Sequence, residues 1–139
     1  MTTTGPYGST IAEHFRRPRN QGTLPAAHAS AEGSNPLCGD RVRLALELDQ
    51  TRDSIAQARF VANACAICVA SASLLTERLH GLSLVKAASI GETDMLSALG
   101  AEIPVARKRC ATLPLEALRG ALATLGNEAS PQSNRSPPP

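Results

Sequence analysis

Two runs of alternating apolar and polar residues constrain the fold of this chain more than any other feature. In residues 41–49 the apolar side chains occupy every second position, at Val42, Leu44, Leu46 and Leu48. After the polar segment 50–54, a second run places Ala56, Ala58, Phe60 and Ala62 at alternate positions. Because successive side chains of a strand point to opposite faces, each run predicts a strand with one buried face. The short connection between the runs predicts an antiparallel hairpin.

Apolar residues at helical spacing predict one helix before the hairpin and four helices after it. The predicted starts are Thr10, with a capping box to Glu13, then Cys65, Ser83, Thr93 and a position just before Pro114. Residues 20–36 predict a loop with room for one short edge strand. We therefore expect an α+β domain over residues 1–126, in which four to five helices cover one face of a small antiparallel sheet of about three strands. Residues 127–139 contain no apolar residue able to anchor them and predict a disordered tail.

The composition excludes several classes of function. Fourteen Lys and Arg against twelve Asp and Glu leave a formal net charge of +2, which is too small for a chain built to neutralise nucleic-acid phosphates. Aromatic residues make up only 2%, so platforms for base stacking are scarce. No apolar run approaches the roughly 20 residues of a membrane helix, and residues 1–9 lack the apolar stretch of an export signal. We therefore expect a cytoplasmic protein with neither nucleic acid nor a membrane as its partner.

Four cysteines are the most chemically informative residues of the chain, and three of them lie at predicted element boundaries. Cys38 precedes the first strand, Cys65 lies where the second strand gives way to a helix, and Cys110 lies in a predicted loop before the last helix. Asp40 follows Cys38 by two residues. Three thiolates and this carboxylate would make a four-coordinate site for zinc or for an iron–sulfur cluster. From the spacing alone, inert buried thiols are an equally good interpretation.

The positions of the cysteines also predict their reactivity. Cys65 at a helix N-terminus, and Cys110 after three cations at 107–109, are expected to have lowered thiol pKa values. Cys68 fits a buried position on the apolar face of its helix better than a ligand position. With Cys65 it forms a C-x-x-C motif, which keeps a small thiol-redox protein as an alternative. The three histidines, His14, His28 and His80, adjoin no cysteine and are expected at the surface.

Four motifs in order along the chain resemble one protein family. They are His14-Phe-Arg-Arg-Pro-Arg-Asn20, Asn35-Pro-Leu-Cys-Gly-Asp40, Cys65 before an Ala-Ser-Ala-Ser helix, and Arg109-Cys-Ala-Thr-Leu113. Together they resemble the U-type iron–sulfur cluster assembly scaffolds, which comprise IscU, SufU and the N-terminal part of NifU. The resemblance extends from about Ser9 to Leu125 and implies a SufE/NifU-like fold.

The resemblance implies a scaffold rather than an enzyme. Such a protein accepts sulfur from a cysteine desulfurase, combines it with iron, holds a transient [2Fe–2S] cluster and passes it to apo iron–sulfur proteins or carrier proteins. The implied ligands are Cys38, Asp40, Cys65 and Cys110, and the three cysteines are also the candidate persulfide acceptors. We expect the harder carboxylate ligand to keep the cluster labile. A homodimer around a shared cluster is one arrangement compatible with the family.

Departures from the family pattern support an alternative, a zinc-binding sulfurtransferase of the SufU type that accepts persulfide sulfur from the desulfurase. The IscU branch has His where this chain has Arg109, and its chaperone-recognition motif is reduced here to residues 103–107. Against the alternative, residues 91–109 leave little room for the insertion of the SufU proteins. In either case we expect the desulfurase to dock near the cysteine loops, with the basic residues 107–109 at the rim.

Overall fold

The computed structural model describes residues 8–37 and 39–129, which form three strands and five α-helices. In chain order they are α1 (Ser9–Arg16), β1 (Ala29–Asn35), β2 (Asp40–Leu48), β3 (Ile55–Asn63), α2 (Ala66–Leu79), α3 (Leu84–Ala88), α4 (Glu92–Leu99) and α5 (Lys108–Ala129), with a short 3₁₀ turn, Val105–Arg107, before α5. The predicted α+β class is confirmed. No helix within the described part of the chain is long and apolar enough to cross a membrane.

The sheet is antiparallel throughout, in the order β1-β2-β3. The predicted hairpin is confirmed as β2 and β3. Its inner face is not fully as predicted, because the register shifts between Glu47 and Leu48. Ile55 is therefore buried and Ala56 is exposed, although the simple alternation placed Ala56 on the side of Phe60.

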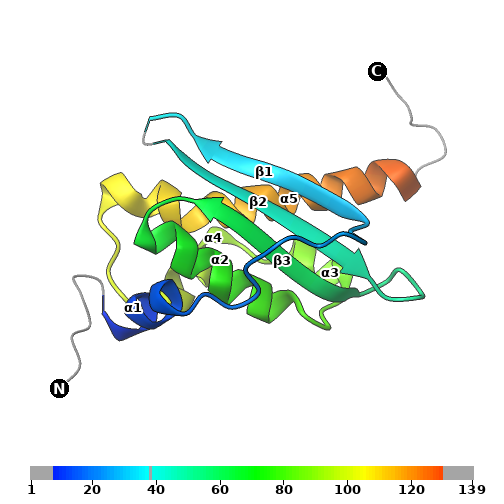
Figure 1. Cartoon of the computed structure of the whole chain (residues 1–139), viewed down its shortest axis with the longest axis horizontal. Coiled ribbons are helices and arrows are strands. Elements are labelled where there is room, and N and C mark those ends of the chain that lie inside the picture. Colours follow the sequence, from blue (N-terminus) through cyan, green and yellow to red (C-terminus); the bar gives the residue numbers. More distant parts are fainter. Residues whose placement is uncertain (1–7, 38, 130–139) are drawn as a thin grey trace.

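Strand β1 is longer than the short edge strand allowed by the sequence. All seven of its residues pair with β2, from Ala29 opposite Leu46 to Asn35 opposite Asp40. The segment between α1 and β1 passes in front of the sheet, and α5 lies behind it (Figure 1).

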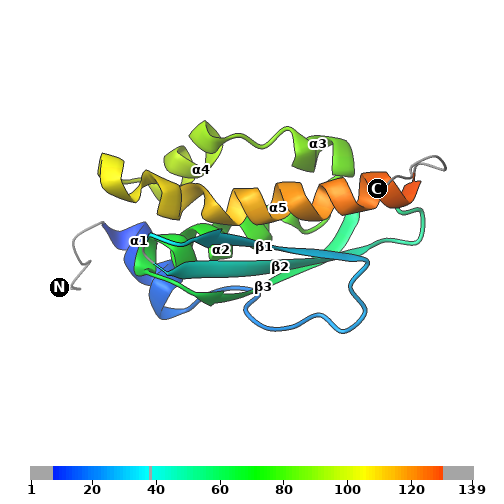
Figure 2. The same ribbon diagram turned by 90° about the horizontal axis from the view of Figure 1, so that it is seen from above.

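The helices cover the inner face of this sheet. Figure 2 shows α5 running along the sheet, with α3 and α4 on its far side. Helix α5 packs on β1 and β2, while α2 packs on β3 and on α5. The inner residues of the strands join those of the helices in one apolar cluster, whose largest fully buried members include Phe60, Leu75, Met95 and Leu118. The prediction that the helices cover one face is therefore confirmed.

Several predicted helix ends are wrong. Helix α1 starts after Gly8, and no side chain caps it, so the expected capping box of Thr10 does not form. Helix α4 is capped at Gly91, whose N–H donates to Asp94 Oδ2 at 2.8 Å, rather than at Thr93. The predicted cap at Ser83 is confirmed by the hydrogen bond from the Lys86 N–H to Ser83 Oγ.

Helix α5 differs most from its prediction. It begins at Lys108, six residues before Pro114, which lies inside the helix. Cys110 therefore lies in the first turn of a helix and not in a loop. The helix continues to Ala129, three residues into the segment 127–139 that is predicted as a tail. Residues 130–139 lie outside the described residues, so the tail itself stays a prediction.

Candidate metal centre

Asp40 is positioned by the tight turn that joins β1 to β2. The Asn35 carbonyl accepts a hydrogen bond from the Gly39 N–H at 2.8 Å, and Asn35 Oδ1 accepts one from the Leu37 N–H at 3.2 Å. Gly39 has φ +79°, a left-handed conformation that glycine adopts without strain. The turn thereby directs the side chain of Asp40, which is 7% exposed, to the inner face of the sheet. Cys38 lies outside the described residues.

The two described cysteines near Asp40 come from the starts of two helices. Cys65 is the N-cap residue of α2 and is half-buried, and Cys110 lies in the first turn of α5 and is 2% exposed. The Cys110 thiol donates a hydrogen bond to Asp40 Oδ2 at 3.4 Å. One ligand atom from each of Asp40, Cys65 and Cys110 lies within 4.8 Å of the others. Residues separated by up to 70 positions in the chain thus meet at one point.

The geometry of this group fits a single metal ion. Zinc binds thiolate sulfur at about 2.3 Å and carboxylate oxygen at about 2.0–2.2 Å, so ligand atoms around one tetrahedral ion lie roughly 3.6–3.8 Å from one another. The ligand atoms of the group lie within 4.8 Å of one another, so the side chains close around one ion by moving about 1 Å at most toward a common centre. Soft thiolates together with one carboxylate suit zinc or iron–sulfur chemistry. The three residues could therefore hold a metal ion or one iron of a cluster.

The surroundings of Cys110 favour its protonated thiol over its thiolate. The pKa of Cys110 is raised to about 12, first by burial and then by hydrogen bonds and charge repulsion from Cys65 and Asp40. The prediction of a lowered Cys110 pKa is therefore wrong for the metal-free protein. The cations at 107–109 are exposed and do not offset the burial of the thiol. A bound cation reverses this balance, because it stabilises thiolates directly.

The remaining candidates lie apart from this group. Cys68 is fully buried in the apolar core, in agreement with the sequence interpretation. Arg109 does not face the group as a ligand would, since its guanidinium donates to the Ser34 carbonyl at 3.1 Å and contacts Glu116. The surface position expected for His14 is wrong, because this residue is only 8% exposed and is bonded to Ser73. Sequence reasoning missed this contact, although the helical spacing of Ile11 and His14 is a signal for a shared buried face.

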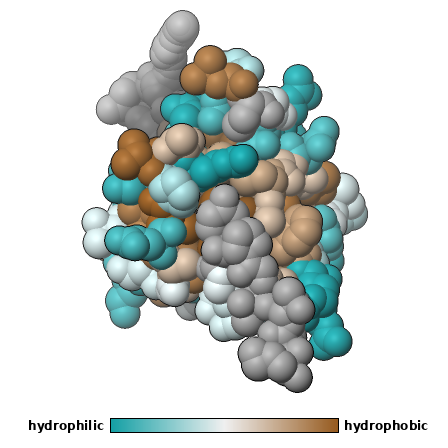
Figure 3. Space-filling view, turned by 90° about the vertical axis from the view of Figure 1, so that its left-hand side faces the viewer, coloured by the Kyte–Doolittle hydropathy of each residue, from teal (hydrophilic) through white to brown (hydrophobic). Residues whose placement is uncertain are grey.

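The surface around the group combines apolar and basic side chains. Leu37 is 96% exposed and Val105 is 83% exposed, and residues 107–109, which follow Val105 closely in the chain, are also exposed. Figure 3 views this end of the molecule and shows apolar groups exposed among hydrophilic ones. A hollow of about 580 Å³, lined by residues that include Leu96, Ile103 and Lys108, lies at the start of α5. Exposed apolar groups beside a reactive centre are typical of a surface that meets other proteins.

A small α+β domain that gathers thiols and a carboxylate at one end of a three-stranded sheet defines a class of metal- or cluster-binding proteins. Residues 6–129 match the family model described as "NifU-like N terminal domain", and the chain belongs to this family. The match spans most of the chain, including every element that positions the metal-ligand group.

Two relatives of the chain bear the names of the two branches considered from the sequence, IscU and SufU. The chain is 31% identical over 116 residues to "Iron-sulfur cluster assembly scaffold protein IscU" of Aquifex aeolicus, covering 84% of this chain and 73% of that protein. It is 33% identical over 135 residues to "Zinc-dependent sulfurtransferase SufU" of Bacillus subtilis, covering 84% of this chain and 89% of that protein. Other relatives are longer, and the chain spans only 23% of a NifU/MnmA protein of Rubrobacter xylanophilus and 39% of a NifU of Azotobacter chroococcum.

The fold agrees with a solved structure of the same family. The chain matches a putative iron–sulfur cluster assembly scaffold protein for the SUF system from Fervidobacterium islandicum with a TM-score of 0.69 and 25% identity. The match covers 87% of this chain and 99% of that one.

Proposed function

We propose that this protein is a cytoplasmic iron–sulfur cluster assembly scaffold. It accepts sulfur from a cysteine desulfurase, combines it with iron into a transient [2Fe–2S] cluster, and transfers the cluster to apo iron–sulfur proteins or carrier proteins. The observation that carries this proposal is the convergence of Asp40, Cys65 and Cys110 within 4.8 Å. Relatives named as scaffolds support it.

The proposed ligands are Cys38, Asp40, Cys65 and Cys110. Cys38 is included because it precedes Asp40 by two residues in the sequence and belongs to the ligand set that the family resemblance implies. Its thiol would supply the fourth ligand that a tetrahedral site requires. The three cysteines are the candidate persulfide acceptors, and among the described two Cys65 is the more exposed to an incoming sulfur.

The desulfurase is proposed to dock at the end of the molecule that carries this group. The exposed side chains of Leu37 and Val105 offer apolar contact area, and residues 107–109 offer positive charge around it. An acceptor protein also has to reach the cluster, so we propose that the cluster is delivered from this same end of the molecule. Two protomers meeting at this end around one cluster would form the homodimer considered for the family.

Anaerobic reconstitution tests the scaffold function directly. The protein is incubated with ferrous iron, L-cysteine, a cysteine desulfurase and dithiothreitol, which supplies electrons to reduce persulfide sulfur to sulfide. The visible absorbance of a cluster and its transfer to an apo-ferredoxin are followed. We expect a transferable cluster in the wild type and in Cys68→Ser, and loss of the cluster in Cys65→Ser. Both substituted residues lie at the start of α2, but only Cys65 belongs to the metal-ligand group. A cluster of normal yield in Cys65→Ser would contradict the proposal.

A zinc-dependent sulfurtransferase is the second candidate function. Arg109, which bonds to Ser34 and Glu116, offers no imidazole ligand for cluster iron, and the SufU relative is matched over 89% of its length. In this case the same ligands hold zinc, and one thiolate accepts the persulfide sulfur. Stoichiometric zinc in protein purified without oxygen, together with stimulated desulfurase turnover and no transferable cluster, would favour it over the scaffold.

The thiol-redox alternative has the least structural support. Cys68 is fully buried among apolar side chains, so an external thiol has no path to its sulfur. A Cys65–Cys68 disulfide that cycles with thioredoxin-like reductants would be needed to revive this interpretation.

A further inference from the structure

A second hollow lies on the outer face of the sheet. The segment 20–28 leaves α1, bridges to β3 between Gln21 and Phe60, and crosses in front of the strands before it enters β1 (Figure 1). Between this crossing segment and the sheet is a hollow of about 180 Å³. Asp40 is buried toward the inner face of the sheet, whereas Arg43, three residues further on, is exposed on the outer face. The hollow is therefore separated by the sheet from the metal-ligand group.

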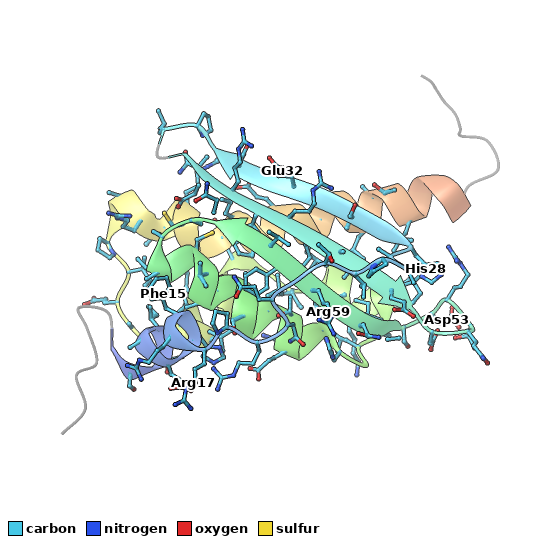
Figure 4. All side chains as sticks on the ribbon, in the orientation of Figure 1. Phe15, Arg17, His28, Glu32, Asp53 and Arg59 are labelled. Carbon is cyan, nitrogen blue, oxygen red and sulfur yellow. The ribbon has the colours of Figure 1, made fainter. Side chains whose placement is uncertain are left out.

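Two arginines from neighbouring strands line this hollow. In the register of β2 and β3, Arg43 lies opposite Val61 and Ala45 lies opposite Arg59. Arg43 and Arg59 are therefore diagonal neighbours on one face, about 7–8 Å apart with their Cβ atoms somewhat closer. Figure 4 labels Arg59 on β3, beside the crossing segment. Both guanidinium groups can reach one small ligand, because each side chain extends over several ångströms.

The positive charge of this pair is only partly balanced. Arg43 contacts Glu32 at 3.9 Å and donates to Ser30 Oγ at 3.3 Å. Among the side chains described in residues 8–37 and 39–125, no carboxylate lies within 4.0 Å of the Arg59 guanidinium. Glu47, also on this face, instead accepts a hydrogen bond from Gln57 at 3.5 Å. Since two positive charges close together repel each other, an anion between the arginines would be stabilising.

We propose that this hollow binds a carboxylate group carried on a short apolar stem. The N–H groups of Arg59 hold the carboxylate in bidentate geometry and Arg43 supplies a second donor group. Leu24 of the crossing segment and Val61 of β3, which line the same hollow, contact the stem. The volume admits a group of a few heavy atoms. Two sources present this chemistry, a free dicarboxylate and an acidic side chain of a partner protein.

Binding is tested by NMR on the full chain, with Arg Nε–H signals recorded beside the backbone amides. Sodium glutarate represents the free dicarboxylate, and N-acetylglutamate amide represents an acidic side chain of a partner. Both are titrated at constant ionic strength against sodium chloride. We expect saturable shifts at the Nε–H of Arg59 and Arg43 and at the Gly22 amide, which borders the hollow. Arg59→Gln should weaken the binding at least tenfold.

Arg41→Gln is the matched control, because Arg41 is exposed on the same face of β2 and is not one of the residues that line the hollow. It should bind as the wild type does. If Arg59→Gln fails to fold, Arg43→Gln gives the same test. Binding of only one ligand identifies the source, and binding of both supports the shared carboxylate chemistry. Equal shifts with chloride, unchanged binding in the arginine variants, or tighter binding of inorganic phosphate would overturn the proposal.

Discussion

Asp40 is chemically unlike the other proposed ligands of the metal centre. Its carboxylate is nearly buried and accepts a hydrogen bond from the Cys110 thiol at 3.4 Å. A carboxylate is a harder ligand than a thiolate and holds cluster iron less tightly. In the proposed scaffold this ligand gives the iron an exchangeable position through which the cluster leaves.

Removing this carboxylate should therefore lengthen the lifetime of the cluster severalfold. The measurement is the decay of the visible absorbance of reconstituted Asp40→Ala under defined oxygen, compared with the wild type. Transfer to an apo-ferredoxin should slow in parallel, because loss and transfer use the same exchangeable position. Faster decay in Asp40→Ala would show that the carboxylate stabilises the cluster instead.

His14 is a buried titratable residue that links α1 to α2. Its Nδ1 lies 2.7 Å from Ser73 Oγ, and its Nε2 lies 4.0 Å from Glu77. The pKa of His14 is lowered from its ordinary value, mainly by burial and then by the positive charge of Arg19, while Glu77 and Glu13 oppose the shift. The folded protein therefore holds this imidazole neutral where the unfolded chain would protonate it.

The linkage of this shift to stability has a defined sign. At pH values above about 6.5, the ordinary pKa of histidine, both states are neutral and the folded state keeps its full stability. As the pH falls through 6.5 toward the lower folded pKa, the unfolded chain binds the proton first and the free energy of unfolding decreases. Urea unfolding of the wild type and of His14→Gln between pH 7.5 and 5.5 checks this. A decrease of equal size in both proteins would contradict the role of His14.

Two buried serines of α2 connect that helix to different partners. The Ser71 hydroxyl donates to the carbonyl of Ala111, which directly follows Cys110 in α5. Ser73 instead bonds to His14 and to the Arg19 N–H, next to α1. Both side chains are fully buried. Ser71 therefore joins the two helices that carry the cysteines of the metal-ligand group, and Ser73 does not.

Substituting each serine by alanine separates positioning from stability. Each variant should lose about 0.5–1.5 kcal/mol of unfolding free energy with its buried hydrogen bond. Only Ser71→Ala should also weaken metal binding, by roughly tenfold, as is typical when a residue that orients ligands is removed. Competition with a chromophoric zinc chelator measures this affinity. Equal zinc affinities in Ser71→Ala and Ser73→Ala would mean that Ser71 stabilises the fold but does not position the metal ligands.

The contact between β1 and α5 depends on a glycine. A Cβ added to Gly33 would lie 2.7 Å from the Leu113 carbonyl oxygen, a backbone atom that cannot move alone. Gly33→Ala should therefore push α5 away from β1 and cost about 1–3 kcal/mol of stability, as overpacking does. At Gly91 a Cβ meets nothing closer than 3.8 Å, so Gly91→Ala is the control. Chemical denaturation compares the two, and a smaller loss in Gly33→Ala than in Gly91→Ala would contradict this packing.

Elements with a strong local pattern could be predicted from the sequence. The β2–β3 hairpin and α2 follow from apolar periodicity, and the α3 cap follows from Ser83. Strand β1 was predicted only as a short edge strand, and its position and length could not be predicted, because its sequence Ala-Ser-Ala-Glu-Gly-Ser-Asn lacks β-branched and aromatic residues. It pairs because β2 and α5 surround it. The start of α5 was misplaced because Pro114, usually a first-turn residue, lies inside this helix.

At the scale of the whole molecule, the metal-ligand group has no local pattern at all. Asp40 comes from the start of β2, Cys65 from the N-cap of α2, and Cys110 from the first turn of α5. The positions at element boundaries suggested the site but could not separate it from scattered buried thiols, and the resemblance to a family decided between the two. The fold brings the three within 4.8 Å because α2 and α5 begin at the end of the sheet where β2 also begins.

A site assembled from three elements exists only in the folded chain, so metal binding and folding should be coupled. An ion whose free concentration is 100 times its dissociation constant adds about 2.7 kcal/mol to the stability of a protein that binds it only when folded. Zinc should therefore raise the thermal midpoint of the wild type and of Cys68→Ser, whose substitution lies in the core outside the group. The increase should be largely lost in Cys65→Ser, which removes a thiolate ligand, and reduced by less in Asp40→Ala, because the carboxylate is the weaker ligand of the group. Equal increases in all four proteins would mean that zinc binds elsewhere, and the proposed centre would have to be abandoned.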